Sequence, residues 1–319
     1  MDTLLLNMLS HPWSMAQEHI DIMCRVLARR YVGIRADFTE ISAAAAARGA
    51  PYTAGVVGIM PLTGMLIPRG NILVDMSGAT SLEMWGKAFM TLVNDDEVKA
   101  IVIDVDSPGG NHANVPETAL MVRQARSVKP IVAVSNFLNA SAAYFIASQA
   151  HQVVGAESSV TGSIGVFTIH QNLQAALEME GIEVTTIFAG KYKTELHPTH
   201  PLSAEAKAFV QSQVDLCYRQ FVAAVAAGRG VTREAVRSGY GQGRALCADD
   251  ALAAGLLDRI ATLEETVKRL QSPQARGAVR ISDESIQSPQ KDPVDGAKLA
   301  AAVAERFDSA GAEPPDAPD

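Results

Sequence analysis

The chain has 319 residues, of which 48% are hydrophobic, and a formal net charge of -8. This composition is typical of a globular protein with one large domain or two small ones. The negative charge excludes the basic surface that nucleic-acid binding requires. The sequence lacks an apolar run of about 18 residues and a basic signal-peptide region, so we expect a cytoplasmic protein without a membrane anchor. The three cysteines lie far apart without metal spacing and fit reduced thiols.

The N-terminal 54 residues are expected to form a helix and a connector. Apolar side chains recur at helical spacing in residues 13–29, which predicts a helix there. An alanine run at 43–47, followed by Gly49 and Pro51, is typical of a partly helical connector.

Residues 55–270 alternate between strand and helix patterns, which predicts one α/β domain with a mainly parallel sheet. The run at 98–106 is apolar and β-branched, as in a buried parallel strand. Further strands are predicted at 56–66, 131–135, 164–166 and 184–188. Helices are predicted at 80–95, 115–127, 141–150, 170–179, 202–227, 232–238 and 248–254.

Residues 271–319 differ in composition from the preceding domain. From residue 272 on, five basic residues stand against nine acidic ones, among many Pro, Ala and Ser residues. Such a segment lacks the apolar residues of a packed core, and we expect a disordered acidic tail.

The first segment with chemical potential is Asp-Ser-Pro-Gly-Gly at 106–110, directly after a predicted buried strand. Gly109 and Gly110 permit backbone angles closed to other residues and leave their amides uncovered. Such amides can stabilise an oxyanion. The alternative is an ordinary strand-to-helix turn.

The second segment is Asn-Ala-Ser-Ala-Ala-Tyr at 139–144, where small residues leave Ser141 accessible to a peptide. Ser141 stands at the start of a predicted helix, and the amide of Ala142 faces the same space. The alternative is that Ser141 only caps the helix.

A serine nucleophile needs a base, and the sequence offers several. Lys193 could serve if burial lowered its pKa toward 7–8. Lys191 would share its face in an extended segment, so spacing leaves both lysines open. His170, oriented by Asp215 or another acid, is a rival base. Ser163 could hold the lysine amine.

Together these segments resemble the signal peptide peptidase A family of serine peptidases, in particular its phage branch of head-maturation proteases of the lambda minor capsid protein C type. The resemblance covers roughly residues 55–265 and implies a Clp/crotonase-like fold. The motifs that carry it are DSPGG (106–110), NASAAYFIAS (139–148), TGSIGV (161–166), GKYKTELHP (190–198), FVAAVAAGRG (221–230) and ALAAGLLD (251–258).

The resemblance implies a Ser–Lys dyad with Ser141 as nucleophile and Lys193 as general base. The remaining implied site residues are Ser163, which orients the lysine, and the oxyanion-hole residues Gly109, Gly110 and Ala142. One departure is that Ala142 and Ala143 follow the serine, where the family often has two glycines. Alanine still donates its amide, so we expect activity to be retained.

The function expected from the resemblance is that of a soluble serine endopeptidase without metal or cofactor. Its substrates would be scaffold and capsid proteins of a phage or prophage head, in the host cytoplasm or the prohead. Family members form rings or domes, so a homo-oligomer with sites shared between subunits is expected. The alternatives are a housekeeping peptidase that degrades peptides or signal peptides, a crotonase-type acyl-CoA enzyme, and an inactive structural capsid component.

Overall fold

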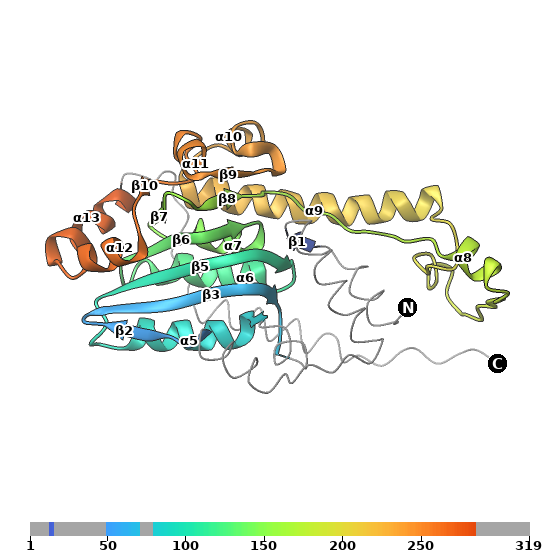
Figure 1. Ribbon diagram of the computed structural model, residues 1–319, viewed down its shortest axis with the longest axis horizontal. Coiled ribbons are helices and arrows are strands. Elements are labelled where there is room, and N and C mark those ends of the chain that lie inside the picture. Colours follow the sequence, from blue (N-terminus) through green and yellow to red (C-terminus); the bar gives the residue numbers. More distant parts are fainter. Residues whose placement is uncertain (1–12, 16–48, 71–78, 285–319) are drawn as a thin grey trace, which may run out of the picture. The chain divides into compact units, whose positions relative to one another are not determined.

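The computed structural model describes residues 13–15, 49–70 and 79–284. Most of the predicted connector, residues 16–29 of the predicted N-terminal helix and the tail beyond residue 284 lie outside these residues. Within them the chain has a mixed α/β fold with a mostly parallel sheet (Figure 1). The predicted α/β class with a mainly parallel sheet is therefore confirmed.

The strands are β1 (Trp13–Met15), β2 (Tyr52–Ala54), β3 (Val57–Ile67), β4 (Thr80–Ser81), β5 (Ala100–Asn111), β6 (Ile131–Ala140), β7 (Gln152–Gly155), β8 (Val160–Gly162), β9 (Ala245–Cys247) and β10 (Arg259–Ile260). The helices are α5 (Leu82–Asn94), α6 (Val115–Ala125), α7 (Ala142–Ala147), α8 (Gln174–Met179), α9 (Ala204–Arg229), α10 (Arg233–Gly239), α11 (Ala248–Ala253), α12 (Leu263–Leu270) and α13 (Pro273–Glu284).

The main path of the sheet runs in the order β10-β7-β6-β5-β3-β2. All neighbours along this path are parallel except β2, which is antiparallel to β3 at the edge. The central strand β5 pairs with β3 from Ala100 to Gly110, with a register irregularity between Thr63 and Met65. The carboxyl ends of β5 and β6 therefore lie at the same edge of the sheet.

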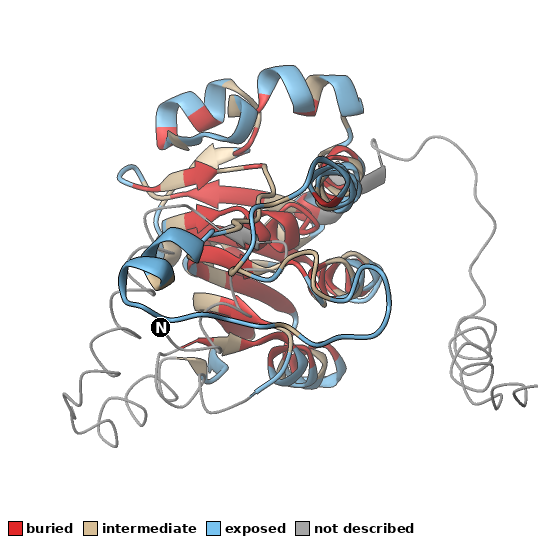
Figure 2. Cartoon of the chain, turned by 90° about the vertical axis from the view of Figure 1, so that its right-hand side faces the viewer, coloured by how far each residue is buried: buried red, intermediate tan, exposed pale blue. Residues whose placement is uncertain are grey.

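Both faces of the sheet are buried, as the apolar strand sequences predict. In β5, Ile101 and Ile103 belong to the core cluster on the side of α5, α6 and α7. The intervening Val102 belongs to the cluster that includes Leu270 of α12 and Val279 of α13. Alternate strand residues thus pack on opposite faces, and helices cover each one. Figure 2 shows the buried strands enclosed by helices with exposed outer sides.

Several predicted boundaries are wrong. Residues 13–15 form strand β1 and not the start of a helix. Residues 106–110 lie inside β5 and not in a loop after it. The predicted tail begins too early, because Pro273–Glu284 is helix α13 with a buried Val279. Residues 164–166 and 184–188 are not strands, while β7 and β8 were not predicted.

A long projection, here called the arm (residues 167–216), leaves the sheet after β8. The chain runs outward to α8 and returns along α9, which lies within the predicted range 202–227 except for its last two residues and has Ser203 as its cap (Figure 1). Only the second half of α9, from Phe221 on, is extensively buried. The arm leaves large apolar side chains exposed, namely Met179, Ile182, Val184, Ile187, Phe188, Tyr192, Phe209 and Leu216.

Candidate active site

Ser141 occupies the single residue between strand β6 and helix α7. Its backbone has φ 57° and ψ −120°, a conformation that an L-residue other than glycine rarely adopts. Two hydrogen bonds hold it there: its amide donates to the Gly162 carbonyl at 2.7 Å, and its carbonyl accepts from the Phe145 amide at 2.9 Å. Backbone strain of this kind costs about 1–3 kcal/mol and is concentrated at functional sites.

The Ser141 side chain does not cap the helix. Its hydroxyl makes no capping hydrogen bond to the first turn of α7, so the alternative that Ser141 is only a cap is wrong. The residue is 1% exposed, and Oγ has no hydrogen-bond partner among the described residues. A buried hydroxyl without a partner costs stability, so this serine is not explained by its contribution to the fold.

The two glycines of β5 are required for different reasons. Gly109 has φ 95°, which favours glycine over every other residue. A Cβ on Gly110 would lie 1.9 Å from the Leu66 carbonyl oxygen on β3, so only glycine fits. The Gly109 amide donates to Ser107 Oγ at 3.2 Å, and that hydroxyl donates to the Gly64 carbonyl at 2.6 Å. The end of β5 that contains Gly109 and Gly110, here called the glycine strand, is therefore closely packed against β3.

Parallel pairing brings the glycine strand to Ser141. The last paired residues of β5 and β6 are Ser107 and Asn139. Gly109 lies two residues after Ser107 on β5, and Ser141 lies two residues after Asn139, directly beyond the end of the parallel strand β6. Ala142 is the first residue of α7, and its amide cannot be satisfied within the helix. The structure thus gathers Ser141, Gly109, Gly110 and Ala142 at one end of the sheet.

Ser163 lies on the other side of Ser141. Strand β8 pairs with β6 so that Gly162 is opposite Ala140, and Ser163 follows immediately. Ser163 also has a positive φ, 54°, and its amide donates to the Arg244 carbonyl at 2.9 Å. The structure therefore brings Ser163 to the site, next to the carbonyl that binds the Ser141 amide.

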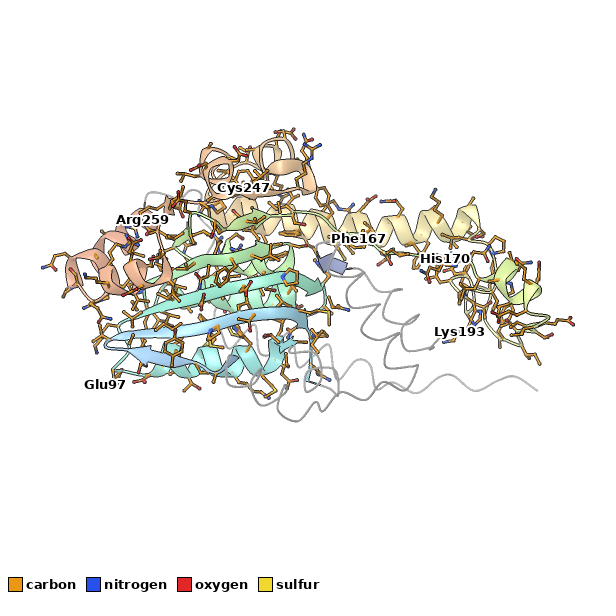
Figure 3. All side chains as sticks on the ribbon, viewed as in Figure 1. Glu97, Phe167, His170, Lys193, Cys247 and Arg259 are labelled. Carbon is orange, nitrogen blue, oxygen red and sulfur yellow. The ribbon has the colours of Figure 1, made fainter. Side chains whose placement is uncertain are left out.

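Lys193 is not at this site within one chain. Its side chain is exposed, and Figure 3 places it on the arm, below His170, while α7 lies over the sheet in Figure 1. The Lys193 amide donates to the Gly190 carbonyl at 3.0 Å, so this segment is a turn and not the extended chain considered from the sequence.

The rival bases also lie on the arm. Lys191 forms an ion pair with Glu205 at 3.4 Å and a hydrogen bond to the Tyr192 hydroxyl at 2.7 Å. These two hydrogen bonds raise the Lys191 pKa, which is the wrong direction for a base. His170 lies along the arm in Figure 3, and the Asp215 carboxylate accepts a hydrogen bond from Gln211 at 2.8 Å.

His112 is a residue near the site that the sequence did not single out. It is buried directly after β5, with Nε2 3.1 Å from Gln220 Oε1 and its ring edge-on to Phe145 at 6.0 Å. Burial lowers the pKa of its imidazole. Through these contacts it connects the end of the glycine strand to α7 and α9. The sequence feature that could have identified His112 as a residue near the site is its position two residues after Gly110.

Two classes of feature do not occur in the described part of the chain. There, no group of three or more His, Cys, Asp or Glu side chains is placed to hold a metal ion. None of the helices in the same residues combines the length and the apolar character needed to cross a membrane.

These observations define a class of protein: an α/β protein with a strained, buried serine between a glycine strand and a helix, which are the parts of an acyl-transfer site. Residues 123–276 match peptidase family S49. This part of the chain is therefore similar to peptidase family S49. The matched region includes Ser141, Ser163 and Lys193, whereas Gly109 and Gly110 precede it.

Curated relatives agree with this family. Capsid assembly protease C of Escherichia phage lambda is 29% identical over 211 residues, which are 66% of this chain and 48% of that protein. A Methanocaldococcus jannaschii protein named as a protease is 33% identical over 180 residues, 56% of this chain and 58% of that protein. The chain thus spans about half the length of these curated relatives. Among solved structures, a Magnetospirillum magneticum enoyl-CoA hydratase/carnithine racemase aligns at 14% identity with a TM-score of 0.43, covering 81% of this chain and 90% of that one.

Proposed function

We propose that this chain is a serine endopeptidase with Ser141 as its nucleophile. The observation that carries the proposal is the Ser141 hydroxyl, which is buried, without a partner in the described residues and held on a strained backbone. A fold tolerates such a residue where function requires it. The peptidase family of the domain supplies the reaction class.

In the proposed reaction, Ser141 Oγ attacks the scissile carbonyl carbon while its proton passes to a neutral amine. The Gly109 amide exchanges its hydrogen bond to Ser107 Oγ for one to the oxyanion, to which the Ala142 amide also donates. Gly110 keeps the glycine strand in place. The carbon–nitrogen bond then breaks, and the amine returns the proton to the leaving nitrogen. Water hydrolyses the resulting ester and restores the serine.

The proposed amine is Lys193 supplied by a second copy of the chain. A lysine can act as a base only when burial lowers its pKa by several units, and Lys193 is exposed in a single chain. Docking of the arm over the Ser141 site of a neighbouring subunit would bury the amine and bring it to the nucleophile. Ser163, beside Ser141, would accept or donate a hydrogen bond that orients this lysine.

The apolar surface of the arm supports a second copy as its partner. Ile187 and Met179 are 94% and 89% exposed, and Phe188 and Phe209 are each 53% exposed. Monomeric proteins rarely expose such a group of large apolar side chains on one projection. Because the proposed interaction runs from the arm of one subunit to the sheet of another, we propose a heterologous interface whose repetition closes a ring.

The proposed substrates are proteins, in particular scaffold and capsid proteins of a phage or prophage head. The support is the lambda relative, which is named as a capsid assembly protease. The proposed place of action is accordingly the host cytoplasm or the prohead. The reaction as written needs no cofactor.

The test compares cleavage of casein and of a co-expressed capsid scaffold by wild type, Ser141→Ala and Lys193→Ala. We expect both variants to lose cleavage while keeping the thermal stability and assembled mass of wild type. Lys191→Ala is the matched control and should retain activity. Full cleavage by Ser141→Ala would overturn the proposed nucleophile, and full cleavage by Lys193→Ala would overturn the proposed base.

A further inference from the structure

Strand β1 pairs with the glycine strand at the candidate active site. It is antiparallel to the end of β5, with Met15 opposite Gly109, Ser14 opposite Gly110 and Trp13 opposite Asn111. Residues 13–15 thus contact, through their backbone, the same glycines that flank Ser141. Figure 1 shows β1 at the end of the sheet from which the arm departs.

The edge that β1 occupies is the one beside Ser141. At Gly109 and Gly110, one edge of β5 is already paired with β3. The opposite edge is paired with β6 only as far as Ser107, because β6 ends at Ala140. Strand β1 therefore takes the position on that free edge, immediately beyond the end of β6 and in line with Ser141.

We propose that residues 109–111 are the strand to which an extended peptide substrate adds, and that residues 13–15 of the same chain occupy this position as an internal strand. A free edge of a sheet binds extended peptides through main-chain hydrogen bonds that depend little on sequence. The inference rests on the proposed function, since occupancy of this edge matters because Gly109 is the proposed oxyanion donor.

The occupancy would make the N-terminal segment a competitive regulator of its own site. An intramolecular strand binds at an effective concentration that a competing free peptide has to exceed. Paired over only three residues, β1 is also short enough to be displaced. A substrate that pairs over more residues or is locally concentrated would replace it, and a weakly binding free peptide would not.

A disulfide lock tests this directly. Directly opposite residues of an antiparallel pair have Cα separations within the range that a disulfide spans, so Trp13→Cys with Asn111→Cys should crosslink on oxidation. The probe is a fluorescein-labelled peptide of residues 9–20, and binding is measured by anisotropy in the Ser141→Ala background. We expect the oxidised double variant to bind at least about tenfold more weakly than the reduced one. Each single cysteine variant serves as a control and should not respond to oxidation.

A second variant releases the edge instead of locking it. Ser14→Pro removes a backbone donor from the middle of β1, whereas Ser14→Ala keeps the backbone intact. We expect the proline variant to bind the probe more tightly than wild type and the alanine variant to match wild type. Failure of the disulfide to form, or equal probe binding by the oxidised and reduced lock, would overturn the inference.

Probe binding separates this inference from the proposed function. Binding that responds to the lock, without hydrolysis of any protein by wild type, would support the peptide edge and remove the peptidase. For hydrolysis, the lock is built in the chain that keeps Ser141. Hydrolysis that is the same in wild type and in this oxidised lock would keep the peptidase and remove the internal strand.

Discussion

Gly110 lies directly against Leu66: a Cβ at position 110 would stand 1.9 Å from the Leu66 carbonyl oxygen and 2.6 Å from its amide nitrogen. Both contacts are with backbone atoms of a buried neighbouring strand, so neither can move without breaking the β3–β5 pairing. The candidate oxyanion strand is therefore built on a contact that only glycine permits.

We expect Gly110→Ala to destabilise the protein by about 3 kcal/mol or more, because the clash must be relieved by backbone movement in the core. Chemical denaturation monitored by circular dichroism measures this. Gly239→Ala is the matched control, since a Cβ there meets nothing within 4 Å and Gly239 ends a helix. It should change stability by less than about 1 kcal/mol. Equal effects of the two substitutions would contradict the contact.

Removal of the Ser141 hydroxyl should not weaken the fold. Because Oγ is buried without a partner in the described residues, Ser141→Ala is expected to leave the free energy of unfolding unchanged or raise it by about 1 kcal/mol. Ser141→Gly should stabilise further where relief of the positive φ exceeds the entropy that glycine loses on folding. Thermal unfolding of the three proteins measures both effects. A clear loss of stability in Ser141→Ala would mean that Oγ makes a stabilising bond.

Sequence patterns predicted those elements whose signals are local. The apolar run within β5 and the long helix α9 are examples, because a buried strand and an extended helical period can be recognised within the segment itself. The extension of β5 through Gly109 and Gly110 could not be predicted from the sequence, because Pro-Gly-Gly is typical of turns. These residues form a strand because they pair with β3. Likewise, β1 follows a helical pattern and becomes a strand through its pairing with β5.

The site was predictable in its parts but not in its assembly. The small residues around Ser141 and the adjacent glycines indicated a nucleophile and an oxyanion strand. The strained backbone of Ser141 could not be predicted, because it depends on the bond from its amide to Gly162. The exposed position of Lys193 also could not, because it depends on the path of the arm. Residues 184–188, for which the sequence predicts a strand, do not form one among the described residues.

Protonation of His112 should destabilise the protein as pH falls. Burial lowers the pKa of His112 in the folded state, so the unfolded chain binds a proton at higher pH than the native one. The contribution of His112 is therefore fully present above its unfolded pKa, near 6.5, and is lost as pH falls through and below that value. We expect His112→Gln to show a shallower loss of stability between about pH 7 and pH 5 than wild type. His197→Gln, at an exposed position, is the control and should leave the slope unchanged.

A charge on the apolar surface of the arm should prevent assembly. Ile187 is 94% exposed in the single chain, and its burial in an interface would not tolerate an unpaired carboxylate. We expect Ile187→Glu to shift the mass measured by analytical ultracentrifugation from an oligomer to a monomer and to abolish cleavage. Thr185→Glu adds the same charge at a nearby exposed polar residue and is the control. An unchanged mass for Ile187→Glu would place Ile187 outside the subunit interface.

Two inactive variants should restore activity to each other when they are mixed. If each site combines Ser141 of one subunit with Lys193 of its neighbour, Ser141→Ala and Lys193→Ala subunits together rebuild intact sites. After dissociation and random reassembly of equal amounts, roughly a quarter of the sites should be intact. An intact site needs a Lys193→Ala subunit, which supplies Ser141, next to a Ser141→Ala subunit, which supplies Lys193. Casein cleavage measures the recovered fraction, and mixing Ser141→Ala with a Ser141→Ala/Lys193→Ala double variant is the control that should stay inactive. Recovery would establish that the arm supplies the base in trans. No recovery from an assembly shown by mass to contain both variants would place Ser141 and its base in the same subunit, and would require the arm to fold back onto its own sheet.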